Sequence, residues 1–159
     1  MDTYKTEYSI VKVTKENYFM FEGMTFIRKN GREKTPEELA LPREYSETFQ
    51  TLANENLHIF AAKTGEKFVG YVSAVYIPKV GSPKFPGHFF IDELWTHLEY
   101  RRSGIAYALM ARAEEAAKES GAIGMRLYTG SDNVAALALY GKCGYKNLGC
   151  DACFMEKEW

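Results

Sequence analysis

The sequence predicts an α/β protein in which a mixed, mostly antiparallel sheet is flanked by helices. Two runs rich in β-branched and aromatic residues, 57–62 and 67–77, are joined by Lys63-Thr64-Gly65-Glu66, which is typical of a hairpin turn. Strand and helix patterns then interleave from residue 88 onwards, and a strand–helix–strand unit requires at least one parallel pair of strands. A length of 159 residues fits one domain with enough interior for a core.

The N-terminal part is expected to form one edge strand followed by helices. Residues 8–13 are rich in β-branched side chains, which fits an edge strand. Thr14 is expected to cap a helix over 15–29, where apolar residues recur at helical spacing. Thr35-Pro36-Glu37-Glu38 predicts another helix start, because it places a hydroxyl at the cap and a proline at the first helical position. A further helix is expected over 43–54.

The next part of the chain reads as loop, strand, helix and strand. Residues 78–86 contain three prolines and predict a loop, and 88–97 predict a strand. Residues 104–120 hold six alanines and end just before Gly121, which predicts a strong helix with a glycine stop. Residues 123–129 read as a strand that follows this helix.

The C-terminal part predicts one more helix and further strands. The helix is expected over 133–143, with Asp132 as its cap. Gly144 would supply the left-handed exit from the helix, and Tyr145 would make the accompanying hydrophobic contact. The last strands are expected within 145–157.

The charges of the chain are nearly balanced, with 20 Lys and Arg, 21 Asp and Glu, and a net charge of −1. A nucleic-acid scaffold would be strongly basic, so we expect no nucleic-acid partner. No apolar run approaches the ~18 residues needed to cross a bilayer, so we expect no membrane partner. Residues 1–9 lack the apolar core of a secretory signal, and we expect a cytoplasmic protein. Cys150 and Cys153 have the spacing of half a zinc site, but a complementary pair is missing, so we expect no metal.

The segment 94–106 has the pattern of an anion-binding turn. A strand ends, Arg101 and Arg102 follow, and a helix begins at a Ser-Gly pair. Free backbone N–H groups and the positive end of the helix dipole converge at such a start, which suits a phosphate or diphosphate. Gly104 lets a ligand approach the main chain because it has no Cβ, and the small Ala106 keeps the first turn open. The spacing alone also fits an ordinary helix start with a solvated arginine pair.

Three segments carry signatures that occur together in one enzyme family. Residues 101–106 match the pattern Q/R-x-x-G-x-G/A, and residues 93–96 read Glu-Leu-Trp-Thr. Residues 133–145 match N-x-x-A-x-x-x-Y-x-x-x-G-F/Y. In this order and spacing, over residues 88–147, they resemble the acetyl-CoA signature, the fourth strand and the second signature block of the GNAT superfamily of N-acetyltransferases. The N-terminal half resembles the family only in the order of its elements.

The resemblance implies a splayed parallel pair of strands, 88–97 and 123–129, with acetyl-CoA in the wedge between them. It also implies a single N-acetyltransferase domain over 1–159, with acceptor-side helices in 1–56 and a cofactor-binding core in 57–159. The residues implied to bind acetyl-CoA are Leu94, Trp95, Thr96, Arg101, Arg102, Ser103, Gly104, Ile105, Ala106, Asn133 and Tyr140.

The same resemblance suggests the catalytic residues. The Tyr140 hydroxyl would lie near the thioester sulfur, where a neutral phenol can protonate the departing CoA thiolate. An amine must lose a proton before it attacks, and Glu93 occupies the position of the carboxylate base of several family members. Asp92 and His97 are alternatives, and Glu93 in an orienting role with solvent as the base is another. A strand N–H near Thr96 would hold the oxyanion of the tetrahedral intermediate.

We therefore expect transfer of an acetyl group from acetyl-CoA to a primary amine of a small molecule by direct attack. A protein or peptide N-acetyltransferase and a non-catalytic acetyl-CoA-binding regulatory module are the alternatives. Exposed edge strands near the C-terminus would allow a homodimer. Acidic residues of the N-terminal part hint at a cationic acceptor such as a polyamine or aminoglycoside, although solvated helix faces explain them equally well. These residues are Glu22, Glu37, Glu38, Glu44 and Glu47.

Overall fold

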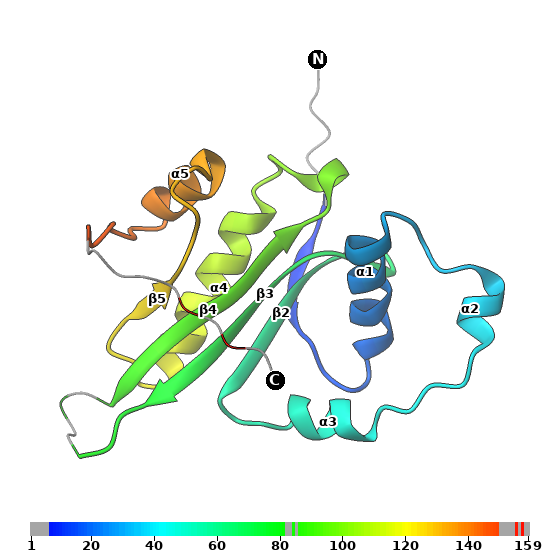
Figure 1. Ribbon diagram of the computed structural model, residues 1–159, viewed down its shortest axis with the longest axis horizontal. Helices are drawn as coiled ribbons and strands as arrows, with labels where there is room; N and C mark the ends of the chain where they lie inside the picture. The colour runs from blue at the N-terminus through cyan, green and yellow to red at the C-terminus, as the bar shows by residue number, and fades with distance from the viewer. Residues whose placement is uncertain (1–6, 82–83, 85, 150–154, 156, 158–159) are drawn as a thin grey trace. The chain divides into compact units, whose positions relative to one another are not determined.

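The computed structural model contains a five-stranded sheet whose strands lie in chain order (Figure 1). The residues described are 7–81, 84, 86–149, 155 and 157. The strands are β1 (Ser9–Lys12), β2 (Leu57–Thr64), β3 (Lys67–Pro78), β4 (Gly87–Thr96) and β5 (Met125–Leu127). The first four pair antiparallel, and β4 pairs with β5 in parallel. The predicted mixed, mostly antiparallel sheet is therefore confirmed.

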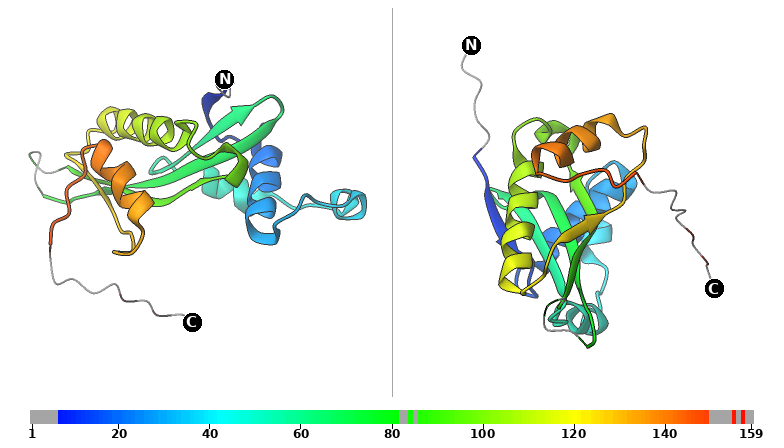
Figure 2. Two further views of the ribbon diagram at one scale, coloured as in Figure 1. Left: turned by 90° about the horizontal axis from the view of Figure 1, so that it is seen from above. Right: turned by 90° about the vertical axis from the view of Figure 1, so that its left-hand side faces the viewer.

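Two long helices cover opposite faces of this sheet (Figure 2). On one face α4 (Ile105–Glu119) packs against β2, β3 and β4, and on the other α1 (Tyr18–Asn30) packs against β3. The short helices α2 (Pro36–Ala40) and α3 (Ser46–Leu52) follow α1 in the chain. None of the helices in the described part of the chain is long and apolar enough to cross a membrane.

The chain divides into two compact units, Met1–Tyr128 and Thr129–Trp159. The first unit holds the sheet with α1 to α4, and the second holds α5 (Val134–Lys142). Both faces of the sheet carry a core, because successive strand residues point to opposite sides. The α4 side buries Phe60, Val72, Phe89, Leu109 and Met110. The α1 side buries Val13, Met20, Met24, Ala61, Phe68 and Tyr71.

The first helix begins later than its sequence predicts. The Asn17 side-chain oxygen accepts a hydrogen bond of 2.8 Å from the Thr14 N–H, and the Asn17 N–H donates to the Thr14 carbonyl at 3.3 Å. This closed turn occupies the residues before Tyr18, so the expectation of a helix from residue 15 capped by Thr14 is wrong.

The second helix start is confirmed as a complete capping box. The Thr35 hydroxyl accepts from the Glu38 N–H at 3.3 Å, and the Glu38 carboxylate accepts from the Thr35 N–H at 2.8 Å. The helix expected over 43–54 is shorter, because the Glu44 carboxylate accepts from the Ser46 N–H at 2.8 Å and holds the preceding residues outside the helix.

The α5 unit confirms the predicted helix and corrects its cap. Asn133, one residue after the predicted Asp132, is the N-cap, and its side-chain oxygen accepts from the Ala136 N–H at 3.2 Å. Gly144 has φ +84°, which confirms the predicted left-handed exit, and the Tyr145 N–H donates to the Tyr140 carbonyl at 2.9 Å. Residues 145–149 form no strand, and the rest of the segment where strands were predicted lies almost wholly outside the described residues.

Candidate active site

β4 and β5 diverge after three paired residues. The parallel pairing joins 89–91 of β4 to 125–127 of β5, and β4 then continues to Thr96. Among the described residues, β5 offers no partner to the outer edge of 92–96. Backbone N–H and C=O groups along such an edge are available to an amide-bearing ligand. The splayed parallel pair that the family resemblance implied is therefore confirmed.

A β-bulge marks the point of divergence. Ser73 of β3 lies opposite Glu93, whereas the next residue, Ala74, lies opposite Ile91, so Asp92 is the extra residue. Asp92 is exposed to solvent. A bulge bends the strand that carries it and increases its local twist, which accounts for the departure of β4 from β5 at this residue.

The turn after β4 leaves a row of backbone N–H groups without acceptors. A short 3₁₀ turn, η1 (Leu98–Tyr100), leads to α4, whose first hydrogen bond joins the Ala108 N–H to the Gly104 carbonyl at 3.0 Å. Within the described part of the chain, the N–H groups of residues 102–107 donate to no acceptor. Arg102 has φ +61° and Gly104 φ +86°. Left-handed residues of this kind gather successive N–H groups into concavities that bind anions, and the positive end of α4 adds to the attraction.

The side chains of this turn leave the N–H row exposed. Arg101 and Arg102 are both exposed, and Arg101 Nε donates to the Thr96 carbonyl at 3.2 Å. The Ser103 hydroxyl donates to a carbonyl of η1. Ile105 points into the core with 1% of its surface exposed, so its backbone alone is available to a ligand.

The space beside Gly104 fits a close ligand. A Cβ built on this glycine would have a single heavy atom within 4 Å, the Tyr8 hydroxyl oxygen at 3.5 Å. Nearby, a Cβ on Gly70 of β3 would lie 2.9 Å from the Trp95 carbonyl oxygen, so glycine is required where β3 approaches the end of β4. Thr96, 9% exposed, buries a hydroxyl oxygen for which the described residues provide no partner.

Glu93 is held from two sides by side chains of α1 and β3. Its Oε1 accepts from Arg28 Nη1 at 2.8 Å, and its Oε2 accepts from the Tyr71 hydroxyl at 2.7 Å. Arg28 also donates to the Tyr71 hydroxyl, which closes a three-membered network. Sequence reasoning missed Arg28 and Tyr71. The available signal was helical spacing, because Arg28 lies one turn after the core residue Met24 and two turns after Met20.

The network sets the ionisation of Glu93. Burial alone would raise the pKa of Glu93, but hydrogen bonds from Tyr71 and Arg28 and the Arg28 charge outweigh it and lower the pKa. Burial and the adjacent carboxylate raise the pKa of Tyr71, so this phenol stays protonated. Glu93 is therefore an ionised, oriented carboxylate at neutral pH.

The alternatives to Glu93 lie on the same stretch of β4. Trp95 and His97 follow Glu93 at every second residue of this stretch, and their rings meet edge to face at 6.0 Å. His97 Nδ1 accepts from the Glu99 N–H at 3.4 Å, so this nitrogen is occupied by a hydrogen bond within the turn. Asp92 is the bulge residue.

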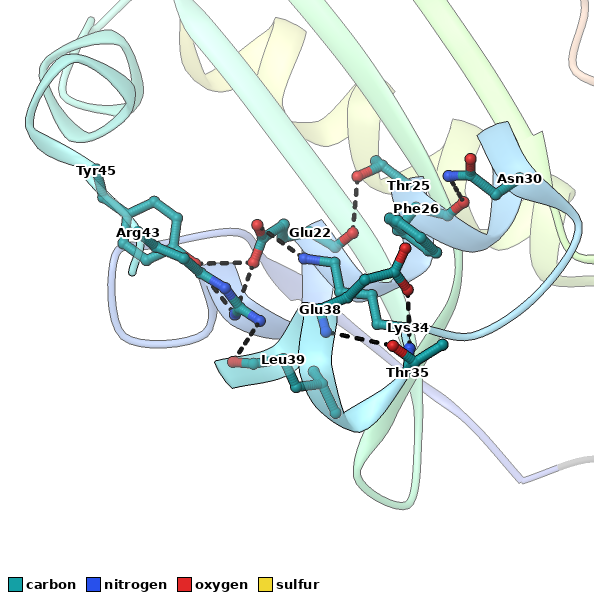
Figure 3. A network of polar contacts seen from close by, with 10 residues as sticks. All are labelled: Glu22, Thr25, Phe26, Asn30, Lys34, Thr35, Glu38, Leu39, Arg43 and Tyr45. Atoms are coloured by element: carbon teal, nitrogen blue, oxygen red, sulfur yellow. Dashed lines mark hydrogen bonds and ion pairs between the residues drawn. The ribbon is translucent and has the colours of Figure 1, made fainter. Parts of the chain in front are cut away.

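On the far side of α1, Glu22 is surrounded by cationic and hydroxyl groups (Figure 3). Lys34 and Arg43 lie 2.9 and 3.0 Å from its carboxylate, and the Tyr45 hydroxyl donates to it at 2.8 Å. Burial would raise the pKa of Glu22, and these partners together lower it. Glu38 is paired in the same way with Arg32 at 2.7 Å. Glu22 and Glu38, two of the acidic residues that suggested a cationic acceptor, are thus neutralised by cations of the same chain.

In the second unit, Tyr140 lies on α5. The residue is half-buried, burial raises the pKa of its phenol, and its ring centroid lies 5.8 Å from that of Tyr145. The Asn133 side-chain oxygen caps α5 and accepts from the Ala136 N–H. Cys143 is half-buried, whereas Cys150 and Cys153 lie outside the described residues. In the ranges that the structure describes, no group of three or more His, Cys, Asp or Glu side chains could hold a metal ion.

Comparison with known proteins places these features in a family. The model of the acetyltransferase (GNAT) family matches residues 24–145, well over half of the chain. Human N-acetyltransferase 8 is 33% identical over 93 residues, which cover 57% of this chain and 39% of that protein. The match thus spans less than half the length of this curated relative.

Solved structures share the fold. A transcriptional regulator from Bacillus halodurans has a TM-score of 0.71 and 25% identity, covering 95% of this chain and 100% of that one. The aminoglycoside N-acetyltransferase AAC(6')-Iy, in complex with a bisubstrate analogue of CoA and acetylneamine, has a TM-score of 0.72 and 17% identity. That likeness covers 96% of this chain and 99% of the other. From the family match and the divergent β4–β5 pair, we conclude that the chain belongs to the GNAT family of acetyltransferases.

Proposed function

We propose that the chain transfers an acetyl group from acetyl-CoA to a primary amine of a small molecule. The observation that carries the proposal is the row of N–H groups at 102–107, for which the described residues provide no acceptor and which follows the open edge of β4 in the chain. A diphosphate supplies the anionic oxygens that such a row attracts. The CoA part of the analogue bound to AAC(6')-Iy supports the same donor here.

The donor would lie along β4 and the turn that follows it. The diphosphate binds the backbone of 101–106, and the exposed guanidinium groups of Arg101 and Arg102 add positive charge. The amides of the pantetheine arm pair with the backbone of 94–96, where β5 provides no partner among the described residues, although the Thr96 carbonyl already accepts from Arg101 Nε. This direction brings the thioester toward the middle of β4, near Glu93.

The reaction would be a direct attack without an acyl-enzyme. The amine nitrogen forms a bond to the acetyl carbonyl carbon, the oxyanion accepts a hydrogen bond from a strand N–H near Thr96, and the carbon–sulfur bond then breaks. The thiolate takes a proton from the Tyr140 phenol, which is neutral at pH 7. The proton lost by the amine passes to Glu93, directly or through water.

The acceptor is proposed as a small amine without several positive charges. The Glu93 charge is matched by Arg28, and the Glu22 charge by Lys34 and Arg43, so these two carboxylates offer little excess negative charge to a polycation. The aminoglycoside substrates of AAC(6')-Iy are therefore less favoured here than monoamines and amino acids.

A CoA-release assay across an amine panel tests the proposal. The panel holds monoamines, amino acids, polyamines, aminoglycosides and short peptides, and calorimetry measures acetyl-CoA binding in parallel. We expect acetyl-CoA binding together with turnover of one small amine. Turnover only with peptides would favour a protein or peptide N-acetyltransferase, and binding without turnover of any amine would favour a regulatory module. Absence of acetyl-CoA binding would reject all three.

A further inference from the structure

We propose that the Tyr8 hydroxyl, from the segment that leads into β1, completes the diphosphate site at the start of α4. This inference rests on the proposed use of acetyl-CoA and adds a donor-binding residue that lies outside every family signature in the chain. Its basis is the position of the hydroxyl oxygen, 3.5 Å from the place where a Cβ on Gly104 would lie.

The position of Tyr8 is fixed by the sheet. Ser9, the residue after Tyr8, pairs with Lys63 of β2. The carbonyl of Glu7, the residue before Tyr8, accepts a hydrogen bond from the Thr64 hydroxyl at 3.3 Å. The start of β1 lies beside η1 and the first turn of α4 in all three views (Figures 1 and 2). Two backbone contacts therefore hold the tyrosine next to the row of free N–H groups.

The hydroxyl adds an uncharged donor to the exposed guanidinium groups of Arg101 and Arg102. Gly104 has no side chain, Ser103 donates to a carbonyl of η1, and Arg101 donates to the Thr96 carbonyl. Within the described residues, the Tyr8 hydroxyl itself makes no hydrogen bond. A phosphate carries more acceptor oxygens than one row of N–H groups can satisfy from one side, and a phenol O–H donates to such an oxygen without a change of charge.

The opposite role is also defined by the geometry. If the tyrosine filled the position of the anion, removal of its hydroxyl or ring would make room for CoA and strengthen binding. If the hydroxyl donates to the anion, removal of the hydroxyl alone weakens binding. The two roles thus predict changes of opposite sign.

Calorimetry on Tyr8→Phe, with Tyr76→Phe as the matched control, tests the inference. Tyr76 loses a hydroxyl that donates to the Pro86 carbonyl, within the hairpin loop after β3. Tyr8→Phe should raise the Kd for CoA about tenfold, the size expected for one hydrogen bond to a charged group. Its inhibition constant for inorganic diphosphate should rise similarly, while that for pantetheine, which has no diphosphate, and the CoA affinity of Tyr76→Phe should stay unchanged.

Each other outcome overturns the inference in a recognisable way. An unchanged CoA Kd in a folded Tyr8→Phe protein shows that the hydroxyl makes no contact with the donor. Tighter CoA binding by Tyr8→Phe or Tyr8→Ala shows that the side chain obstructs the turn. An equal loss for CoA and pantetheine shows an effect on the fold or on the other arm of the donor. Failure of the unmodified chain to bind CoA would instead remove the proposed function itself.

Discussion

Arg28 Nη1 lies 2.8 Å from Glu93 Oε1, so the candidate carboxylate base of β4 is already paired with a guanidinium from α1. The pair joins two parts of the first unit to which the family resemblance gives different roles: the acceptor-side helices and the donor-binding strand. In the proposed reaction, the low proton affinity of this paired carboxylate favours a water-mediated loss of the amine proton.

Replacement of Arg28 should shift the pH dependence of activity. Arg28→Gln removes the cation that lowers the Glu93 pKa, so that pKa rises and the acidic limb of the kcat/KM profile moves to higher pH. Lys29→Gln, on the exposed neighbouring residue, is the control and should leave the limb in place. An acidic limb that does not move in Arg28→Gln would mean that Glu93 ionisation does not limit the reaction.

The same lowered pKa predicts a pH dependence of stability. Because the folded-state pKa of Glu93 lies below its unfolded value, the ionised carboxylate stabilises the fold above the unfolded pKa, and this contribution is lost as pH falls through the folded pKa. Urea unfolding from pH 7 to pH 3 should therefore show a smaller loss of stability in Glu93→Gln than in the unmodified chain. Parallel curves for the two proteins would contradict the assignment.

Gly104→Val should abolish tight CoA binding. The branched side chain would stand where the diphosphate approaches the N–H row, and the left-handed φ of +86° adds a backbone strain of about 1–2 kcal/mol. Gly121→Val is the matched control, because Gly121 has φ +74°, has nothing within 4 Å of a built Cβ, and lies at the opposite end of α4. Calorimetry should find CoA affinity lost in the first variant and kept in the second. Equal affinities in two folded proteins would remove the site.

Tyr140→Phe should separate binding from chemistry. Loss of a general acid costs about a hundredfold or more in rate, whereas the phenyl ring keeps the packing of α5. We expect kcat to fall by that factor, with CoA affinity within about twofold, when both are measured on the same preparation. A rate within a few-fold of the unmodified enzyme would assign the proton to solvent.

The contact of α4 with the sheet should dominate the stability of the first unit. Leu109 is fully buried, and Leu109→Ala should lower the free energy of unfolding by about 2–5 kcal/mol through lost burial and a residual cavity. Leu39→Ala, at a side chain that is 57% exposed, should change it by less than about 0.5 kcal/mol. Denaturant unfolding measures both, and a small cost at Leu109 would show that the site collapses around the truncated side chain.

Much of the fold follows from short-range sequence signals. The Thr35 capping box, the Gly65 hairpin turn and the alanine-rich α4 each depend on residues within a few positions of one another, and each appears as predicted. The errors occur where a local side chain competes with the helix: Asn17 delays α1, and Glu44 delays α3.

The candidate site was predictable in its backbone and less so in its side chains. The N–H row at 102–107 follows from a strand, a turn and a glycine, all in one segment. The Arg28–Glu93 pair joins residues 65 positions apart, and no local pattern indicates a partner at that separation. The contact of Tyr8 with the Gly104 region is longer-range still, because it depends on the placement of β1 at the edge of the sheet.

The extra residue, Asp92, also changes which side chains of β4 face which side of the sheet. Before it, Phe89 and Ile91 are buried on the same side of the sheet as Val72 and Ala74, beneath α4. In a regular strand, Glu93 would continue that odd-numbered series and its charge would point into the apolar layer. The insertion turns Glu93 toward Arg28 instead, so one strand forms a wall of the core in its first half and carries the candidate carboxylate in its second.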